Sequence, residues 1–247
     1  MEETYLRNFA PFTALAFAAI LAFPTAALAE HIHSDAPDAA TGTFIVPLGV
    51  YQLEQNVQVD MNAGVPSLGF PSLHRFGLSD TVELRVESPI LAFTQATGVQ
   101  REWVALEGKW NIEKLMPAGL PALALFGTAR LEANNQVTPA IALLADIQLP
   151  LETGLNANLG GEFPSSGPAL TYAASVGHKL YGDNWAIYGE VAGGYDPTNS
   201  LGANVDGGVK YRVDDDTQVM LAAGTDALKP GTTYYVTTNY SHRWGKY

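Results

Sequence analysis

Residues 51–61 read YQLEQNVQVDM, and this stretch decides the fold. Apolar or aromatic side chains stand at the odd positions Tyr51, Leu53, Val57, Val59 and Met61, and polar side chains occupy the even ones. A period of two places the two classes on opposite sides of a β-strand. The stretch therefore predicts a strand with one polar face and one apolar face.

The same alternation recurs along most of the chain. It is found at residues 51–61, 82–87, 104–112, 123–131, 137–148, 155–162, 170–179, 185–195, 201–212, 218–223 and 234–244. One more segment, around Leu68 to Phe76, is interrupted by Pro66 and Pro71, which cannot donate to a strand ladder. Segments of this length and an even total predict an all-β, antiparallel up-and-down transmembrane barrel of about 12 strands.

The first residues have the layout of an export signal. An apolar run spans residues 9–23, Pro24 follows it, and Ala27-Leu28-Ala29 forms a small-residue cleavage site. The alternative is an uncleaved N-terminal anchor, although the run is short for a membrane-spanning helix. We expect a signal peptide at residues 1–29, a flexible periplasmic tail at 30–43 and the barrel at 44–247.

Composition excludes several other classes of protein. The chain has 247 residues, 24 glycines, no cysteine, 15% charged residues and a net charge of −12. The absence of cysteine excludes disulfide scaffolds, zinc ribbons and thiol nucleophiles. A chain this acidic repels phosphate, so no nucleic acid is expected as a partner.

Turns and aromatic residues give an orientation. Tight connections such as 78–80 and 214–216 alternate with looser ones such as 92–100 and 226–231, which predicts short periplasmic turns and longer outer loops. Aromatic residues then gather on the apolar face at both ends of the strands, as membrane interfaces favour. The expected interface residues are Tyr51, Trp110, Trp185, Tyr211 and Trp244 at the periplasmic end, and Phe70, Tyr172, Tyr195 and Tyr234 at the outer end.

The polar face of the strands carries charges of both signs. The acids assigned to the lumen are Glu54, Asp60, Glu83, Glu87, Glu107, Asp146, Glu162, Glu190 and Asp206. The bases are Arg75, Arg85, Lys109, Arg130, Lys179, Lys210, Arg212 and Arg243. We expect these groups to form cross-strand pairs in a nearly neutral lumen.

A barrel of about 12 strands lies in size between the filled eight-stranded kind and the open sixteen-stranded kind. This size predicts a narrow passive channel or transport component for small solutes. Two alternatives remain open at this point. One is a non-conducting outer-membrane scaffold or adhesin barrel, and the other is a soluble secreted ligand-binding barrel.

Signals for other chemistry are weak. His31 and His33 are candidate metal ligands in the tail, although a polar leader explains them equally well. Ser175 and Ser241 lie on the opposite strand face from His178 and His242, so no Ser–His pair is in register and no catalytic residue is assigned. No cofactor is expected.

Three stretches carry a family resemblance: PSLHRFGLSDTVELRV at residues 71–86, LTYAASVGHKLYGDNWAIYGEVAGGYD at 170–196 and NVDGGVKYRVDDDTQVMLAAGTD at 204–226. Each repeats strand, turn and strand, with aspartate in the turn. Over roughly residues 66–244 the sequence resembles the MetA-pathway phenol-degradation family of bacterial outer-membrane β-barrel proteins. The resemblance implies a barrel with a transport role, and it carries no catalytic signature.

The predicted location is the bacterial outer membrane, reached through the periplasm. The expected partners are outer-membrane lipid, small solutes and the barrel-assembly machinery. That machinery reads a C-terminal aromatic residue, which is here either Trp244 or Tyr247.

Overall fold

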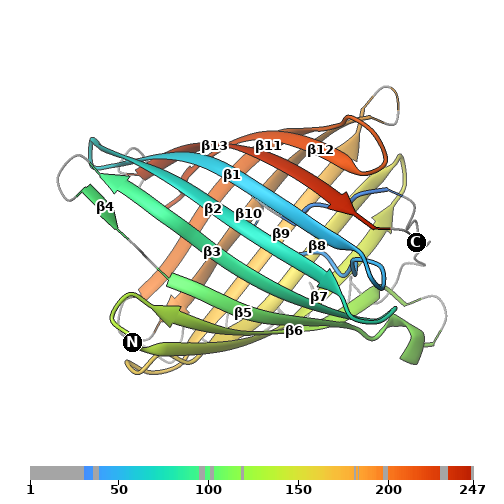
Figure 1. Ribbon diagram of the computed structural model, residues 1–247, viewed down its shortest axis with the longest axis horizontal. Helices are drawn as coiled ribbons and strands as arrows, with labels where there is room; N and C mark the ends of the chain where they lie inside the picture. Colours follow the sequence, from blue (N-terminus) through green and yellow to red (C-terminus); the bar gives the residue numbers. More distant parts are fainter. Residues whose placement is uncertain are drawn as a thin grey trace, which may run out of the picture.

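The computed structural model describes residues 31–35, 39–94, 98–100, 103–117, 120–180, 182, 184–196, 200–228 and 233–245. Within these residues the chain forms a closed antiparallel β-barrel, seen from the side in Figure 1. The expected signal peptide, its cleavage at Ala29 and the terminal Tyr247 lie outside the described residues.

The strands are long and follow one another around the barrel. They are β1 (Tyr51–Asn62), β2 (Val65–Gly77), β3 (Val82–Thr94), β4 (Gly98–Gln100), β5 (Trp103–Asn111), β6 (Ala122–Glu132), β7 (Val137–Leu149), β8 (Thr153–Glu162), β9 (Ala169–Lys179), β10 (Trp185–Asp196), β11 (Ser200–Arg212), β12 (Thr217–Asp226) and β13 (Thr233–Trp244). The short β4 and β5 pair with β3 in one continuous register, so they are two pieces of a single barrel strand. The barrel therefore has 12 strands, as the alternation predicted.

Each strand pairs with its neighbours in sequence, and β13 pairs with β1 to close the ring. The closing register sets Tyr51 opposite Trp244, so the barrel begins and ends at the same rim. We call this rim the proximal end and the opposite rim the distal end. Because every strand has two partners, the closed barrel has no free edge, and a backbone in lipid requires this.

The proline-interrupted segment around Leu68 to Phe76 forms strand β2, and an irregularity in its pairing accommodates a proline. The register between β2 and β3 shifts between Gly69 and Pro71. A bulge leaves a residue unpaired, so a proline there does not remove a ladder hydrogen bond. Pro66 lies near the distal end of β2, opposite Met61 of β1.

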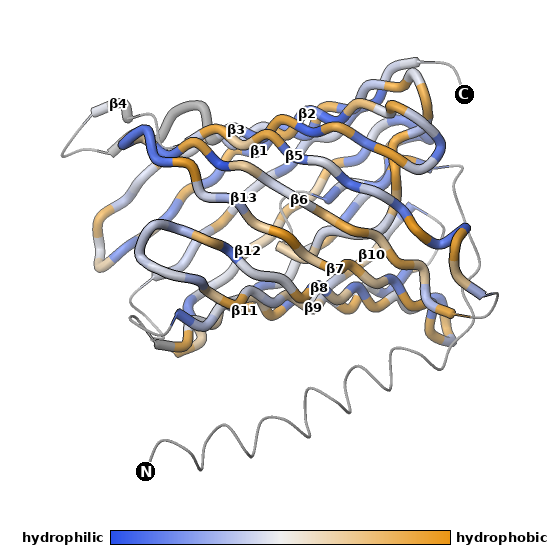
Figure 2. The backbone as a smooth tube through the Cα atoms, turned by 90° about the horizontal axis from the view of Figure 1, so that it is seen from below, coloured by the Kyte–Doolittle hydropathy of each residue, from blue (hydrophilic) through white to orange (hydrophobic). Residues whose placement is uncertain are grey.

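The barrel is apolar outside and polar inside. Outward side chains such as Leu106, Ile141 and Leu221 are 56%, 55% and 54% exposed, whereas inward Glu54, Arg75 and Glu83 are fully buried. The alternation of hydrophilic and hydrophobic residues can be followed along the strands in Figure 2. This distribution suits a lipid-facing exterior and contradicts a soluble secreted barrel, which would expose its polar face.

The connections do not sort by length as expected. Distal connections at 63–64 and 133–136 are no longer than the proximal turns at 78–81 and 213–216. The long connection at 112–121 is proximal and includes a single 3-10 turn, Glu113–Leu115. Loop length therefore gives no orientation. Within the described ranges, no helix is both long and apolar enough to cross a membrane.

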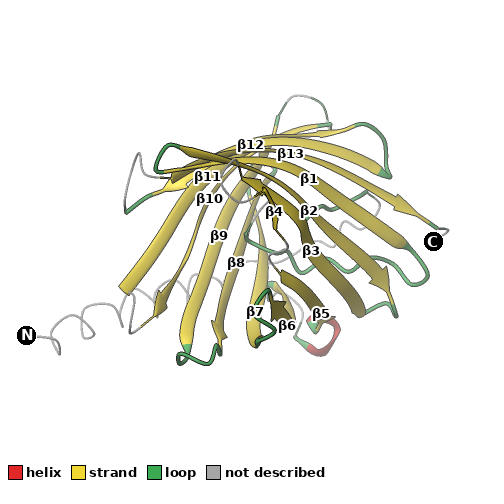
Figure 3. Ribbon diagram, turned by 60° about the vertical axis from the view of Figure 1, so that its left-hand side comes forward, coloured by secondary structure: helices red, strands yellow, loops and turns green. Residues whose placement is uncertain are grey.

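The chain ahead of β1 lies inside the barrel. We call residues 31–35 and 39–50 the N-terminal segment; it runs within the ring of strands in Figures 1 and 3. Its backbone N–H groups contact lumen carboxylates on strands as far apart as β1, β3, β7 and β10. We expected a flexible periplasmic tail at residues 30–43. This expectation is wrong for the described part, because the backbone N–H groups of that part donate hydrogen bonds to the lumen wall.

Candidate functional site in the barrel lumen

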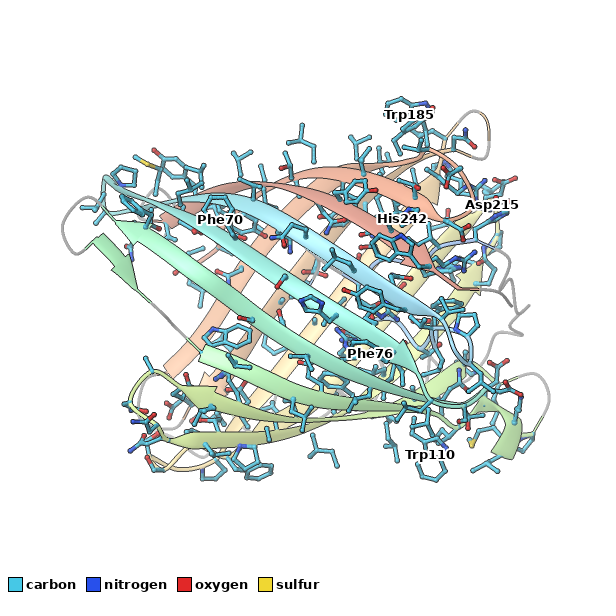
Figure 4. All side chains as sticks on the ribbon, in the orientation of Figure 1. Phe70, Phe76, Trp110, Trp185, Asp215 and His242 are labelled. Atoms are coloured by element: carbon cyan, nitrogen blue, oxygen red, sulfur yellow. The ribbon has the colours of Figure 1, made fainter. Side chains whose placement is uncertain are left out.

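The N-terminal segment enters the lumen at the proximal end. The ring of His31 lies 2.9 Å from the Asp215 carboxylate, and the Ile32 N–H donates to the Asp215 carbonyl at 2.9 Å. Asp215 belongs to the turn between β11 and β12, at the rim labelled in Figure 4. The segment is therefore fixed to the rim before it turns inward.

An ionic cluster holds the segment inside the barrel. Asp35 Oδ2 lies 2.7 Å from Lys109 Nζ, 2.9 Å from Arg85 Nη1 and 3.3 Å from Arg75 Nη1. Burial alone would raise the pKa of the Asp35 carboxyl, but Arg75, Lys109 and Arg85 hold it well below its usual range. Asp35 is therefore a carboxylate that bridges β2, β3 and β5.

The arginines of the cluster also pair with carboxylates of the wall. Arg75 donates two hydrogen bonds to Glu83, at 2.8 and 3.0 Å, and one to Glu54 at 2.9 Å. Arg85 Nε lies 2.8 Å from Glu107 Oε2. Cross-strand pairing of lumen charges was predicted, and here it places opposite charges next to each other where they are removed from water.

Lys109 differs from the arginines in its partners. Its described contacts within hydrogen-bond distance are to Asp35, at 2.7 Å, and to the carbonyl of Phe44, at 3.1 Å. Both partners belong to the N-terminal segment. The position of the lysine ammonium therefore depends on the segment.

Four lumen carboxylates accept backbone N–H groups of the segment. Glu54 accepts from Asp35 at 3.0 Å, Glu190 from Ala39 and Ala40 at 2.8 and 2.7 Å, Asp146 from Thr43 at 2.8 Å, and Glu83 from Val46 at 2.7 Å. Charge-assisted hydrogen bonds of this kind are stronger than neutral ones. These carboxylates, predicted from the sequence as lumen lining, thus hold the segment in place.

The segment leaves the lumen against β2 at Gly77. Gly49 N–H donates to the Gly77 carbonyl and Gly77 N–H donates to the Val50 carbonyl, both at 3.1 Å. A Cβ at Gly77 would overlap the carbonyl oxygens of Pro47 and Val46. Glycine is required here because the two backbones pass too closely for a side chain.

Acidic groups predominate in the distal half of the lumen. Arg130 Nε lies 2.7 Å from Glu132, its Nη1 lies 3.6 Å from Glu162, and its guanidinium stacks over Trp103. Other inward positions at this end hold Asp60, Asp196 and Asp226. A cavity of about 430 Å³ is lined by Glu162, Asp196 and Asp226 together with glycines and apolar residues.

Basic and acidic groups lie together nearer the proximal end. Lys210 lies 4.5 Å from the ring centre of Tyr188, and Arg243 donates to Asp216 at 2.6 Å. The remaining predicted lumen residues have inward registers: Glu87 on β3, Lys179 on β9, and Asp206 and Arg212 on β11. The lumen is therefore acidic at its distal end and mixed in charge toward its proximal end, a distribution that the sequence analysis did not foresee.

The predicted interface aromatics lie on the outer face. Trp110 and Trp185 project outward near the proximal end and Phe70 lies toward the distal end (Figure 4). Tyr51 stacks on Trp244 at 5.4 Å and Trp185 packs on Tyr211 at 4.5 Å between ring centres. At the distal ends of their strands, Tyr195 and Tyr234 are exposed, and Tyr172 donates to the Gly202 carbonyl at 3.1 Å.

The structure separates the residues considered for metal binding and catalysis. His31 contacts Asp215, whereas the His33 ring stacks on Phe44 with ring centres 4.6 Å apart. In the part of the chain that the structure describes, no three His, Cys, Asp or Glu residues are grouped to hold a metal ion. Ser241 faces the lumen beside Ser34, while His242 contacts Thr217 on the outer face.

Sequence reasoning missed Asp35, the carboxylate of the N-terminal segment that pairs with three barrel strands. It lies in an irregular segment without a two-residue period, so no face could be assigned to it. One weak signal was available in the lumen itself. Asp146 on β7 and Glu190 on β10 have no assigned base at neighbouring positions, and such groups need another partner when they are buried.

No family model matches the sequence, and neither does any curated protein. Solved structures do resemble the fold. The chain is similar to "KdgM porin in complex with disordered oligogalacturonate" (7% identity, 78% of this chain and 99% of that chain, TM-score 0.60). It is also similar to the COG4313 outer membrane channel from Pseudomonas putida F1 (9% identity, 86% of this chain and 100% of that chain, TM-score 0.57). A third similar structure is the NanC porin (7% identity, 77% of this chain and 98% of that chain, TM-score 0.60). The chain therefore has the fold of outer-membrane channel barrels.

Proposed function

We propose that this protein is an outer-membrane channel of narrow bore for small solutes. The observation that carries the proposal is the closed barrel with exposed Leu106, Ile141 and Leu221 outside and a lumen of ionised groups inside. An apolar exterior places the barrel in a membrane, and a charged interior suits a path for polar solutes. The fold shared with porins and an outer-membrane channel supports the same function and location.

The acidic residues at the distal end support a preference for cations at that mouth. Asp60, Glu162, Asp196 and Asp226 lie on inward positions there, beside Arg130. A mouth lined by one sign of charge concentrates ions of the opposite sign. We expect solutes that carry positive charge to enter this mouth more readily than anions.

The N-terminal segment also favours a second function, a non-conducting barrel that acts as a scaffold or adhesin. Contacts from the segment to β1, β3, β7 and β10 cross the lumen, so the segment narrows the path wherever it lies. Which function holds depends on whether a path remains beside the segment or opens when it moves.

Single-channel conductance in a planar bilayer under a salt gradient tests the proposal. Discrete current steps with a cation preference are expected, and Arg130→Glu is expected to strengthen that preference because it adds a carboxylate to the distal lumen. Val137→Glu, nearby on the outer face, is the matched control for the added charge. Folded and inserted protein that passes no current would favour the scaffold function instead.

The finer family assignment remains part of the proposal. The turns after Lys179 and after Arg212 support membership of the MetA-pathway phenol-degradation family, since both carry aspartate between long strands. The neighbours named above are porins and a channel, so we assign no enzymatic reaction to the chain. Outer-membrane lipid and the assembly machinery, through Trp244 on β13 or through Tyr247, are the proposed partners.

A further inference from the structure

The lumen binds the N-terminal segment mainly through the main chain of the segment. The N–H groups of Asp35, Ala39, Ala40, Thr43 and Val46 all donate to lumen carboxylates. These N–H groups would be present in almost any peptide. The acceptors therefore recognise an extended backbone rather than a particular sequence.

The carbonyl groups of the segment are bound in the same way. Gln52 and Arg75 donate to the His33 carbonyl at 2.8 and 2.9 Å, and Lys109 donates to the Phe44 carbonyl at 3.1 Å. Asn111 donates to the Thr43 carbonyl at 3.2 Å. Donors and acceptors of the wall thus serve both kinds of main-chain group.

Two side chains of the segment add hydrogen bonds to the wall: Ser34 donates to Glu54 at 2.8 Å and Thr43 to Asp146 at 2.7 Å. A third side chain, that of Asp35, receives a charged site. Three cationic donors, on Arg75, Arg85 and Lys109, converge on a single oxygen of Asp35 at 2.7 to 3.3 Å. Such convergence selects a carboxylate over an amide, because an amide brings no charge and its NH₂ group cannot accept. The lumen therefore combines backbone recognition with one charge-specific position.

We propose that the lumen is a peptide-binding site, which takes an extended peptide carrying one carboxylate side chain. The N-terminal segment occupies this site in cis. The inference goes beyond the proposed function, because it concerns which molecule the lumen binds rather than whether the barrel conducts. A tethered ligand has an effective concentration in the millimolar range, so an added peptide binds only when the cis contacts are weakened.

The test uses the full chain in detergent, with Asp35→Lys to weaken the cis contacts. A lysine there is repelled by Arg75, Arg85 and Lys109. Ala40→Cys supplies a reporter thiol, because Ala40 is buried in the lumen and the chain has no cysteine of its own. We expect a maleimide to label this thiol about tenfold faster or more when Asp35→Lys is also present, since losing charged hydrogen bonds costs at least about 1.5 kcal/mol.

The probe is a fluorescent synthetic peptide with the sequence of residues 31–46, and its anisotropy reports binding to the Asp35→Lys chain. Reordering its residues, with Ser34, Asp35, Gly42 and Thr43 kept in place, should change the dissociation constant by less than about threefold. Asparagine in place of its Asp35 should weaken binding by about tenfold or more. N-methylation of the amides of Ala39, Thr43 and Val46 should abolish binding, because the donors are lost.

Three results would overturn the proposal. The first is a reporter thiol that stays protected in the Asp35→Lys chain, which would make the segment a permanent part of the wall. The second is a released segment with no peptide binding, and the third is undiminished binding of the N-methylated peptide. If Asp35→Lys does not assemble, Asp35→Asn is the second variant. Arg130→Gln is the control, at a lumen position outside the contacts described for the N-terminal segment.

The proposal of peptide binding and the proposal of conduction can be refuted independently of each other. A chain that binds the peptide and passes no current would refute the channel and retain this site. A chain that conducts and binds no peptide, although its segment is released, would retain the channel and refute this site.

Discussion

Lys109 shows how a single lumen residue can depend on a segment remote in sequence. Its contacts to Asp35 and to the Phe44 carbonyl join β5 to the N-terminal segment. Lys109→Gln should therefore loosen the segment, because a charge-assisted hydrogen bond contributes about 1.5–3 kcal/mol. Maleimide labelling of an Ala40→Cys reporter should accelerate about tenfold or more.

The matched control for Lys109→Gln is Arg130→Gln, which removes a lumen cation that pairs with Glu132 and Glu162 instead. This control should leave the labelling rate unchanged. Equal acceleration in both variants would mean that total lumen charge, rather than the contact with Asp35, keeps the segment in place.

Gly77 makes a second prediction at the residue scale. A side chain there would overlap the backbone of Pro47 and Val46, so Gly77→Ala should lower the free energy of unfolding by about 1–3 kcal/mol. Urea unfolding in micelles, followed by tryptophan fluorescence, measures this change. Gly108→Ala is the control, because a Cβ at Gly108 meets open space. Similar unfolding of both variants would refute the close approach at Gly77.

Strands are the elements that the sequence predicts well. Residues 51–61 alternate because one face meets lipid and the other the lumen, and the structure has β1 at Tyr51–Asn62. The strand β2 was also predicted, although Pro66 and Pro71 interrupt its alternation, and the irregularity at Gly69 and Pro71 shows how one of them is accommodated. A period of two is a direct consequence of barrel geometry, so it can be read from one chain.

The N-terminal segment could not be predicted in the same way. Its shape follows contacts with Glu83, Asp146 and Glu190, which lie on three separate strands. No local period encodes such contacts, and Pro47 and Gly49 suggest only an irregular chain. The expected difference in loop length failed for a related reason, because the length of a connection does not depend on the alternation of its strands.

The two faces of one strand give a prediction at the element scale. Ile141 faces outward on β7, and its neighbour Ala140 faces the lumen beside Glu162. Ile141→Arg should lower the free energy of unfolding in lipid vesicles by about 2–4 kcal/mol, because a cation on the lipid face is poorly solvated. Ala140→Arg should cost much less, and a reversed order would contradict the assigned faces.

At the scale of the whole molecule, the barrel and its N-terminal segment form one charged interior. Asp35 joins three strands near the proximal end, and acidic side chains prevail at the distal end. Alternation predicted which residues face inward, but the acidic excess at the distal end became visible only with the register of every strand. A solute that passes this interior must therefore meet both the acidic distal end and the segment.

The conductance of wild-type protein compared with Asp35→Lys, in planar bilayers, tests the central claim most directly. If the barrel is a channel narrowed by its own N-terminal segment, the wild type should show small discrete steps and the variant distinctly larger ones. Identical steps in both proteins, with the segment shown by labelling to be released in the variant, would contradict this account.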